Sequence, residues 1–115
     1  MTPMMVITKP VDRAFLKELA KERFGDMVKA VVDCERGIMA IGGELHADEE
    51  QLLLEDGSKQ EVLWGINIYP DDESSDWIEF DSMINLRPSQ SNRSRGIEDK
   101  KIREIILRIV SQLVK

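Results

Sequence analysis

The sequence predicts an α+β protein with a mostly antiparallel sheet of four to five strands and helices packed on one face. Two pairs of short apolar runs, each pair joined by a turn, indicate antiparallel hairpins. Three segments with apolar residues three or four positions apart indicate amphipathic helices. Along the chain these elements give the order β-α-β-β-α-β-β-α. The length suits a single domain over residues 1–115.

The first half of the chain predicts a strand, a helix and a hairpin. An apolar, β-branched run at residues 4–8 is typical of a strand. A helix is expected within residues 11–26, with Asp12 as its N-cap, because a carboxylate accepts from the free N–H groups of a first turn. Alternating apolar residues over 27–43 predict a hairpin. Its turn at 35–37 ends in a glycine, which tolerates positive φ.

The second half predicts a short helix, a second hairpin and a long helix. Asp48 is the expected N-cap of the short helix. Strands over 62–69 and 77–86 form the second hairpin, around an acidic turn. Asp99 is the expected N-cap of the last helix. Six apolar residues of that helix share one stripe that must be buried, namely Ile102, Ile105, Ile106, Ile109, Val110 and Leu113.

The composition is that of a globular protein with an apolar core. The chain is 42% hydrophobic and 33% charged, and no apolar run approaches the roughly 18 residues of a membrane-spanning helix. The start of the sequence, MTPMMVITKP, lacks the basic and apolar regions of an export signal. The only cysteine is Cys34, which cannot form an internal disulfide. We therefore expect a reduced, cytoplasmic setting.

Charge is segregated along the chain. Residues 44–81 contain thirteen acidic residues and one basic residue, whereas residues 82–115 contain eight basic and three acidic residues. The formal net charge of −6 disfavours a nucleic-acid partner, because such binding depends on neutralising phosphates. The basic C-terminal third is the expected place for an anionic partner.

The segment NLRPSQSNRSRG (residues 85–96) is the predicted ligand-binding segment. It carries three arginines and no carboxylate, and a guanidinium group offers donors that match carboxylates and phosphates. The predicted ligand-binding residues are Arg87, Arg93, Arg95, Asn85, Gln90 and Asn92. In an alternative interpretation, the arginines pair with Glu79, Asp81 or the acids of 71–76 and hold the segment against the sheet.

The segment GGELHAD (residues 42–48) contains the only histidine and supports a second interpretation. His46 and Glu44 are the candidate catalytic residues of a small hydrolase-like enzyme or a metal site. Asp33 or Asp81 would supply a further carboxylate. A single histidine without another histidine or cysteine nearby is a poor zinc site, so we expect no metal.

Several long motifs resemble a family of small uncharacterised prokaryotic proteins that is catalogued as a domain of unknown function. The similarity covers about residues 6 to 110 and is carried by RFGDMVKAVVD, GIMAIGGELHADEE, LLLEDGS, LWGINIYP and WIEFDSMINLRPSQSNRSRGIED. The resemblance implies one self-contained domain. It implies no activity, cofactor or site residue.

These observations favour a non-enzymatic binding or interaction module without a cofactor. Its expected partner is an anionic small molecule or an acidic protein surface. Residues 85–96, which we call the arginine-rich segment, would hold this partner. We expect no membrane association. A homodimer formed through an open sheet edge is a further alternative.

Overall fold

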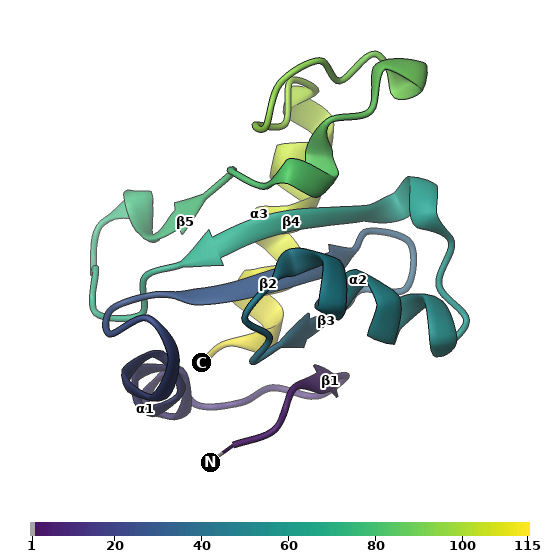
Figure 1. The fold of residues 1–115 in the computed structure, drawn as a ribbon. Coiled ribbons are helices and arrows are strands. Elements are labelled where there is room, and N and C mark those ends of the chain that lie inside the picture. Colours follow the sequence, from purple (N-terminus) through teal and green to yellow (C-terminus); the bar gives the residue numbers. More distant parts are fainter. Residues whose placement is uncertain (1) are drawn as a thin grey trace.

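The computed structural model describes residues 2–115 and contains the predicted order of strands and helices (Figure 1). The strands are β1 (Met5–Ile7), β2 (Val28–Asp33), β3 (Ile38–Ile41), β4 (Leu63–Ile68) and β5 (Ile78–Glu79). The helices are α1 (Arg13–Arg23), α2 (His46–Glu55) and α3 (Lys100–Leu113). Within residues 2–115, the helices fall short of the length and apolarity that a membrane span requires.

The five strands form one antiparallel sheet in the order β1-β3-β2-β4-β5. β2 lies at its centre, between β3 and β4 (Figure 1). The turn between β2 and β3 is confirmed: Gly37 has φ +68°, and the Asp33 carboxylate accepts the backbone N–H groups of Glu35 and Arg36. Positive φ at Gly37 lets the chain reverse within a few residues.

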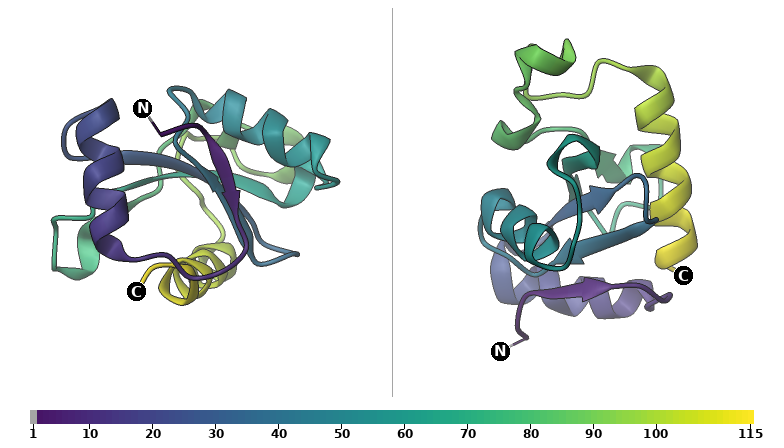
Figure 2. Two further views of the ribbon diagram at one scale, coloured as in Figure 1. Left: turned by 90° about the horizontal axis from the view of Figure 1, so that it is seen from below. Right: turned by 90° about the vertical axis from the view of Figure 1, so that its right-hand side faces the viewer.

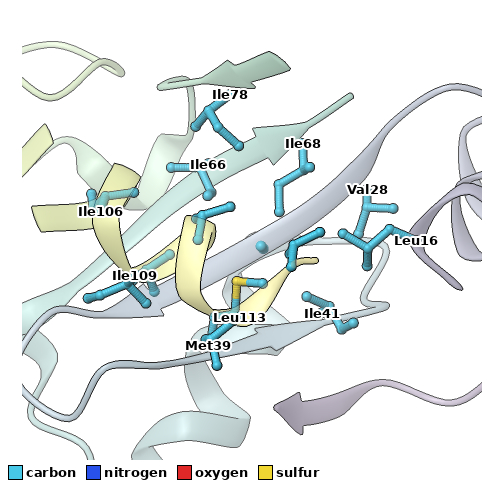
Figure 3. Packing of buried hydrophobic residues seen from close by; sticks show 14 of the residues in the cluster. Leu16, Val28, Met39, Ile41, Ile66, Ile68, Ile78, Ile106, Ile109 and Leu113 are labelled. Atoms are coloured by element: carbon cyan, nitrogen blue, oxygen red, sulfur yellow. The ribbon is translucent and has the colours of Figure 1, made fainter. Parts of the chain in front are cut away.

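One face of the sheet packs against α1 and α3 and forms the larger core (Figure 3). Alternate residues of the central strands point to this face, as the two-residue period of a strand requires. They are Val28, Ala30, Val32, Met39, Ile41, Trp64, Ile66 and Ile68. The predicted stripe of α3 is confirmed, since Ile106, Ile109, Val110 and Leu113 are buried there and Ile102 and Ile105 pack against them.

The opposite face of the sheet is covered by α2. Leu53 of α2 lies in a second core with Val31, Ala40 and Leu63. The left view of Figure 2 shows α2 and α3 on opposite sides of the sheet. The expectation that the helices share one face therefore holds for α1 and α3 but not for α2. The reason is that β2 and β3 carry apolar residues at successive positions, so both of their faces need cover.

The three predicted N-caps have different outcomes. Asp99 caps α3, because its carboxylate accepts the N–H of Lys101 at 2.8 Å. Asp12 occupies the N-cap position of α1, but its side chain makes no capping hydrogen bond. The prediction that Asp48 caps the short helix is wrong, since α2 begins earlier and Leu45 is its N-cap. The first turn of α2 therefore lacks a side-chain cap.

The predicted strand over 77–86 is shorter in the structure. Only Ile78–Glu79 pairs with β4, as β5. Beyond it, Ser82 accepts the N–H of Ile84 and caps a short 3₁₀ turn, so the chain leaves the strand path there. Asn85 lies at the end of this turn, where it contacts the β4 backbone with its side-chain amide.

Candidate functional site

Arg87 is part of the packing of the molecule. Its side chain is buried, with an exposed fraction of 9%, and its Nη2 lies 3.1 Å from Oε2 of Glu50 in α2. The guanidinium carbon also lies 4.8 Å from the ring centroid of Trp64. A carboxylate and an aromatic face hold this guanidinium within the fold, while its buried Nη1 has no hydrogen-bond partner in residues 2–115. Arg87 therefore connects the arginine-rich segment to α2 and β4.

Asn85 and Asn92 hold the arginine-rich segment in shape. The amide of Asn85 accepts from the N–H of Gly65 at 2.8 Å and donates to the carbonyl oxygen of Gly65 at 2.9 Å. Asn92 donates to three backbone carbonyls of residues 85, 94 and 96 and accepts the N–H of Glu98. Both side chains are buried. Their polar atoms are therefore used within the segment and with β4.

The remaining predicted residues lie on the surface. The Nε of Arg95 lies 2.8 Å from Oδ1 of Asp81, and its side chain is 55% exposed. The alternative in which an arginine pairs with Asp81 is thus found for Arg95. The guanidinium of Arg93 has no carboxylate within 4.0 Å in residues 2–115. Gln90 donates to the backbone carbonyl of Glu61.

A small pocket lies where α2 begins, between the sheet and the segment that follows β5. We call it the α2 pocket. Its volume is about 170 Å³. The polar residues that line it are Lys29 of β2, His46 of α2, and Ser82 and Arg95 of the later segment. Two predictions that looked independent in the sequence, Arg95 and His46, therefore meet at one site.

His46 lines the α2 pocket and carries a hydrogen-bond acceptor. The ring is 8% exposed, and its Nε2 lies 2.8 Å from the carbonyl oxygen of Ile66. A carbonyl only accepts, so Nε2 carries the proton and Nδ1 has a lone pair. Burial lowers the pKa of His46 from its ordinary value, which favours this neutral form at pH 7. Nδ1 has no hydrogen-bond partner in the part of the chain that the structure describes.

The electrostatics of the α2 pocket favour an anion. Lys29 and Arg95 supply two positive charges, and the carboxylate of Asp81 on Arg95 offsets one of them. The first turn of α2 lies at the positive end of the helix dipole and has no side-chain cap, although the N–H groups of Asp48 and Glu49 bond to the carbonyl of Leu45. Asp48 and Glu49 are acidic residues of this turn, but neither lines the α2 pocket. Cationic side chains and the start of a helix are groups that attract negative charge.

The rim of the α2 pocket is apolar. Leu45 and Met83 are unusually exposed for large apolar residues, at 57% and 62%, and both line the pocket together with Ala47 and Ile84. An apolar rim around a few polar groups is the usual composition of a small-molecule site.

Because Gly65 has no side chain, it leaves room for two residues that line the α2 pocket. A Cβ at this position would lie 2.6 Å from Oγ of Ser82 and 3.2 Å from Cδ2 of His46. Any side chain at residue 65 would thus displace two lining residues.

Sequence reasoning missed Lys29, Ser82 and Gly65, because neither hydropathy nor a motif distinguishes them. Only the pairing of β2 with β4 brings Lys29 beside this part of the sheet.

The enzyme interpretation is not supported by the positions of its residues. Glu44 lines a second cavity of about 430 Å³, which we call the acidic cavity, together with Asp48 and Glu55. His46 lines the α2 pocket instead. Asp33, a further candidate, accepts hydrogen bonds within the β2–β3 turn and from Ser58. Across residues 2–115, no group of three histidine, cysteine, aspartate or glutamate residues is placed to hold a metal ion.

Comparison with known proteins identifies the family. Residues 5–113 match the family described as "Protein of unknown function (DUF5674)". The match covers nearly the whole chain, so the protein belongs to this family, and the resemblance to a domain of unknown function is confirmed. No curated protein matches the chain. No solved structure matches it either.

Proposed function

We propose that the protein is a binding module that holds a small anion in the α2 pocket. The observation that carries the proposal is the meeting of Lys29, Arg95 and the uncapped first turn of α2 around one small pocket. His46 adds a second, independent feature, since a buried imidazole with an unpartnered nitrogen lines the same pocket. Arg95 is the one of the six predicted ligand-binding residues that lines the α2 pocket.

Binding without catalysis fits the surroundings of His46. A general-base histidine is usually oriented by a carboxylate, which stabilises the imidazolium that forms when it takes a proton. His46 is held by the backbone carbonyl of Ile66, and burial lowers its pKa. Both features disfavour the protonated state that acid–base catalysis needs.

Thermal unfolding with sulfate, phosphate and acetate, against sodium chloride at equal ionic strength, tests the proposal. An anion present at about 100 times its dissociation constant stabilises the folded state by about 2.7 kcal/mol. We expect a concentration-dependent rise in the melting temperature for at least one of these anions. Arg95→Gln and Lys29→Gln should reduce or remove it.

Arg93→Gln is the matched control. It removes the same charge from the same segment, but Arg93 does not line the α2 pocket. We expect this variant to keep the full shift. Equal losses in Arg93→Gln and Arg95→Gln would mean that the effect is general charge screening, and the proposal would then be wrong.

A further inference from the structure

We propose that the ligand of the α2 pocket is a small hydroxycarboxylate, with one negative charge and a hydroxyl group on the carbon beside the carboxylate. This inference rests on the proposed function and names its ligand class. It follows from the charge of the α2 pocket, from the hydrogen-bonding state of His46 and from the size and lining of the site.

The charge of the α2 pocket suits a monoanion. Lys29 and Arg95 line it, and the Nε of Arg95 lies 2.8 Å from the carboxylate of Asp81. Two cations and one carboxylate leave one net positive charge. A dianion would place a second negative charge close to Asp81 without a further cation to offset it. A carboxylate matches this balance better than a fully ionised phosphate does.

His46 requires a donor on the ligand. Its Nδ1 is an acceptor, because Nε2 donates to the carbonyl of Ile66. A simple carboxylate has only acceptor oxygens, so it would face this lone pair without donating a hydrogen bond to it. A hydroxyl group can donate to Nδ1 while the neighbouring carboxylate contacts Lys29 and Arg95. An amino group would add a positive charge beside these two cations, which disfavours an amino acid.

The volume of the α2 pocket limits the size of the group attached to the hydroxycarboxylate. The volume of about 170 Å³ is below the range of roughly 300–1,000 Å³ typical of sites for drug-sized ligands. Leu45 and Met83 offer exposed apolar surface at the rim. A short alkyl group on the ligand would cover this surface. We therefore expect a compact 2-hydroxy acid with a small aliphatic chain.

Matched ligand pairs test the inference on the wild-type protein. Isothermal titration compares lactate with propionate, and 2-hydroxy-3-methylbutanoate with 3-methylbutanoate. Each pair differs only in the hydroxyl group. We expect the hydroxylated member to bind about fivefold more tightly, the size of effect that one neutral hydrogen bond gives. We also expect the larger hydroxy acid to bind more tightly than lactate, because it covers more of the apolar rim.

The imidazole resonances give a second measurement that needs no substitution. His46 is the only histidine in the sequence, so its ¹⁵N signals require no assignment. We expect free Nδ1 to show the shift of an unprotonated nitrogen and to move upfield when a hydroxy acid binds. Propionate should leave it nearly unchanged. His46→Phe, if it folds, should bind lactate and propionate equally.

The outcomes separate this inference from the proposed function. Equal affinity within each pair, with Nδ1 unchanged, would overturn the hydroxycarboxylate inference but leave anion binding in place. Binding of sulfate or phosphate with no binding of any carboxylate would do the same. If no anion binds at all, both the inference and the proposed function are wrong.

Discussion

At the residue scale, the three arginines of residues 85–96 differ in what surrounds them. Arg87 is buried between Glu50 and Trp64, Arg95 pairs with Asp81 at the mouth of the α2 pocket, and Arg93 has no carboxylate partner in the described residues. The sequence shows three similar side chains in one polar segment. Their partners are far away along the chain, so only the fold decides which arginine is buried and which lines the α2 pocket.

The burial of Arg87 leads to a stability prediction. Arg87→Ala leaves the carboxylate of Glu50, whose side chain is only 14% exposed, without its partner. Removing one member of a buried ion pair costs about 3 kcal/mol, and we expect a loss of that size in urea denaturation. Arg93→Ala is the control, with an expected change within about 0.5 kcal/mol, as for other surface positions. A similar small change for both variants would show that the ion pair contributes little.

At the scale of elements, α3 was predicted together with its N-cap, whereas the helix α2 was predicted with the wrong N-cap and on the wrong face of the sheet. The six-residue apolar stripe and the Asp99 cap fix α3 from local sequence, and both are found in the structure. α2 begins before the residue that looked like its cap, because buried His46 is anchored to Ile66 across the sheet. The strand expected over 77–86 ends early, and after it Ser82 caps a 3₁₀ turn and the Asn85 side chain bonds to Gly65. Such long-range hydrogen bonds leave no periodic pattern in the sequence.

The buried face of α2 carries two ionisable groups, His46 and Glu49, one turn apart. Both lie near Lys29, and Asp81 and Arg95 also act on His46. Burial lowers the pKa of His46, and it raises the pKa of Glu49 well above 4.5. Glu49 accepts the N–H of Gly43, while its other oxygen is buried without a partner in residues 2–115. In the folded protein, both groups therefore favour their neutral forms.

The state of Glu49 predicts how stability depends on pH. A pKa that is raised by folding means that the folded protein holds this proton more tightly than the unfolded chain does. The free energy of unfolding therefore falls as the pH rises from about 4.5 through the raised value. Glu49→Gln keeps a neutral side chain of the same shape and cannot ionise. It should match the wild type in urea denaturation near about pH 5 and be the more stable of the two near about pH 8.

His46 does not affect this comparison, because it is present in both proteins. Its lowered pKa destabilises the fold at acid pH in the wild type and the variant alike, as the unfolded chain takes up the proton first. Parallel pH profiles for wild type and Glu49→Gln would contradict the account of Glu49 as a neutral buried acid.

At the scale of the whole molecule, the fold class, the element order and the antiparallel sheet could be predicted from hydropathy and turn residues. The apolar residues at successive positions of β2 and β3 show that both sheet faces need cover, but they do not show which helix packs on which face. The position of α2 is what creates the candidate site: it places His46 over β4, beside Lys29 of β2 and the segment that carries Arg95. A pocket assembled from three separate regions of the chain has no motif by which sequence reasoning could find it.

Amide NMR mapping during a titration with lactate, and with phosphate in parallel, tests the central claim most directly. We expect saturable shifts at the backbone amides of His46 and Ala47 and at the Nε–H of Arg95, which line the α2 pocket. The amides of Gln51, Leu52 and Glu55 in the acidic cavity should stay unchanged. Shifts centred on the acidic cavity, or none with either anion, would contradict anion binding at the start of α2.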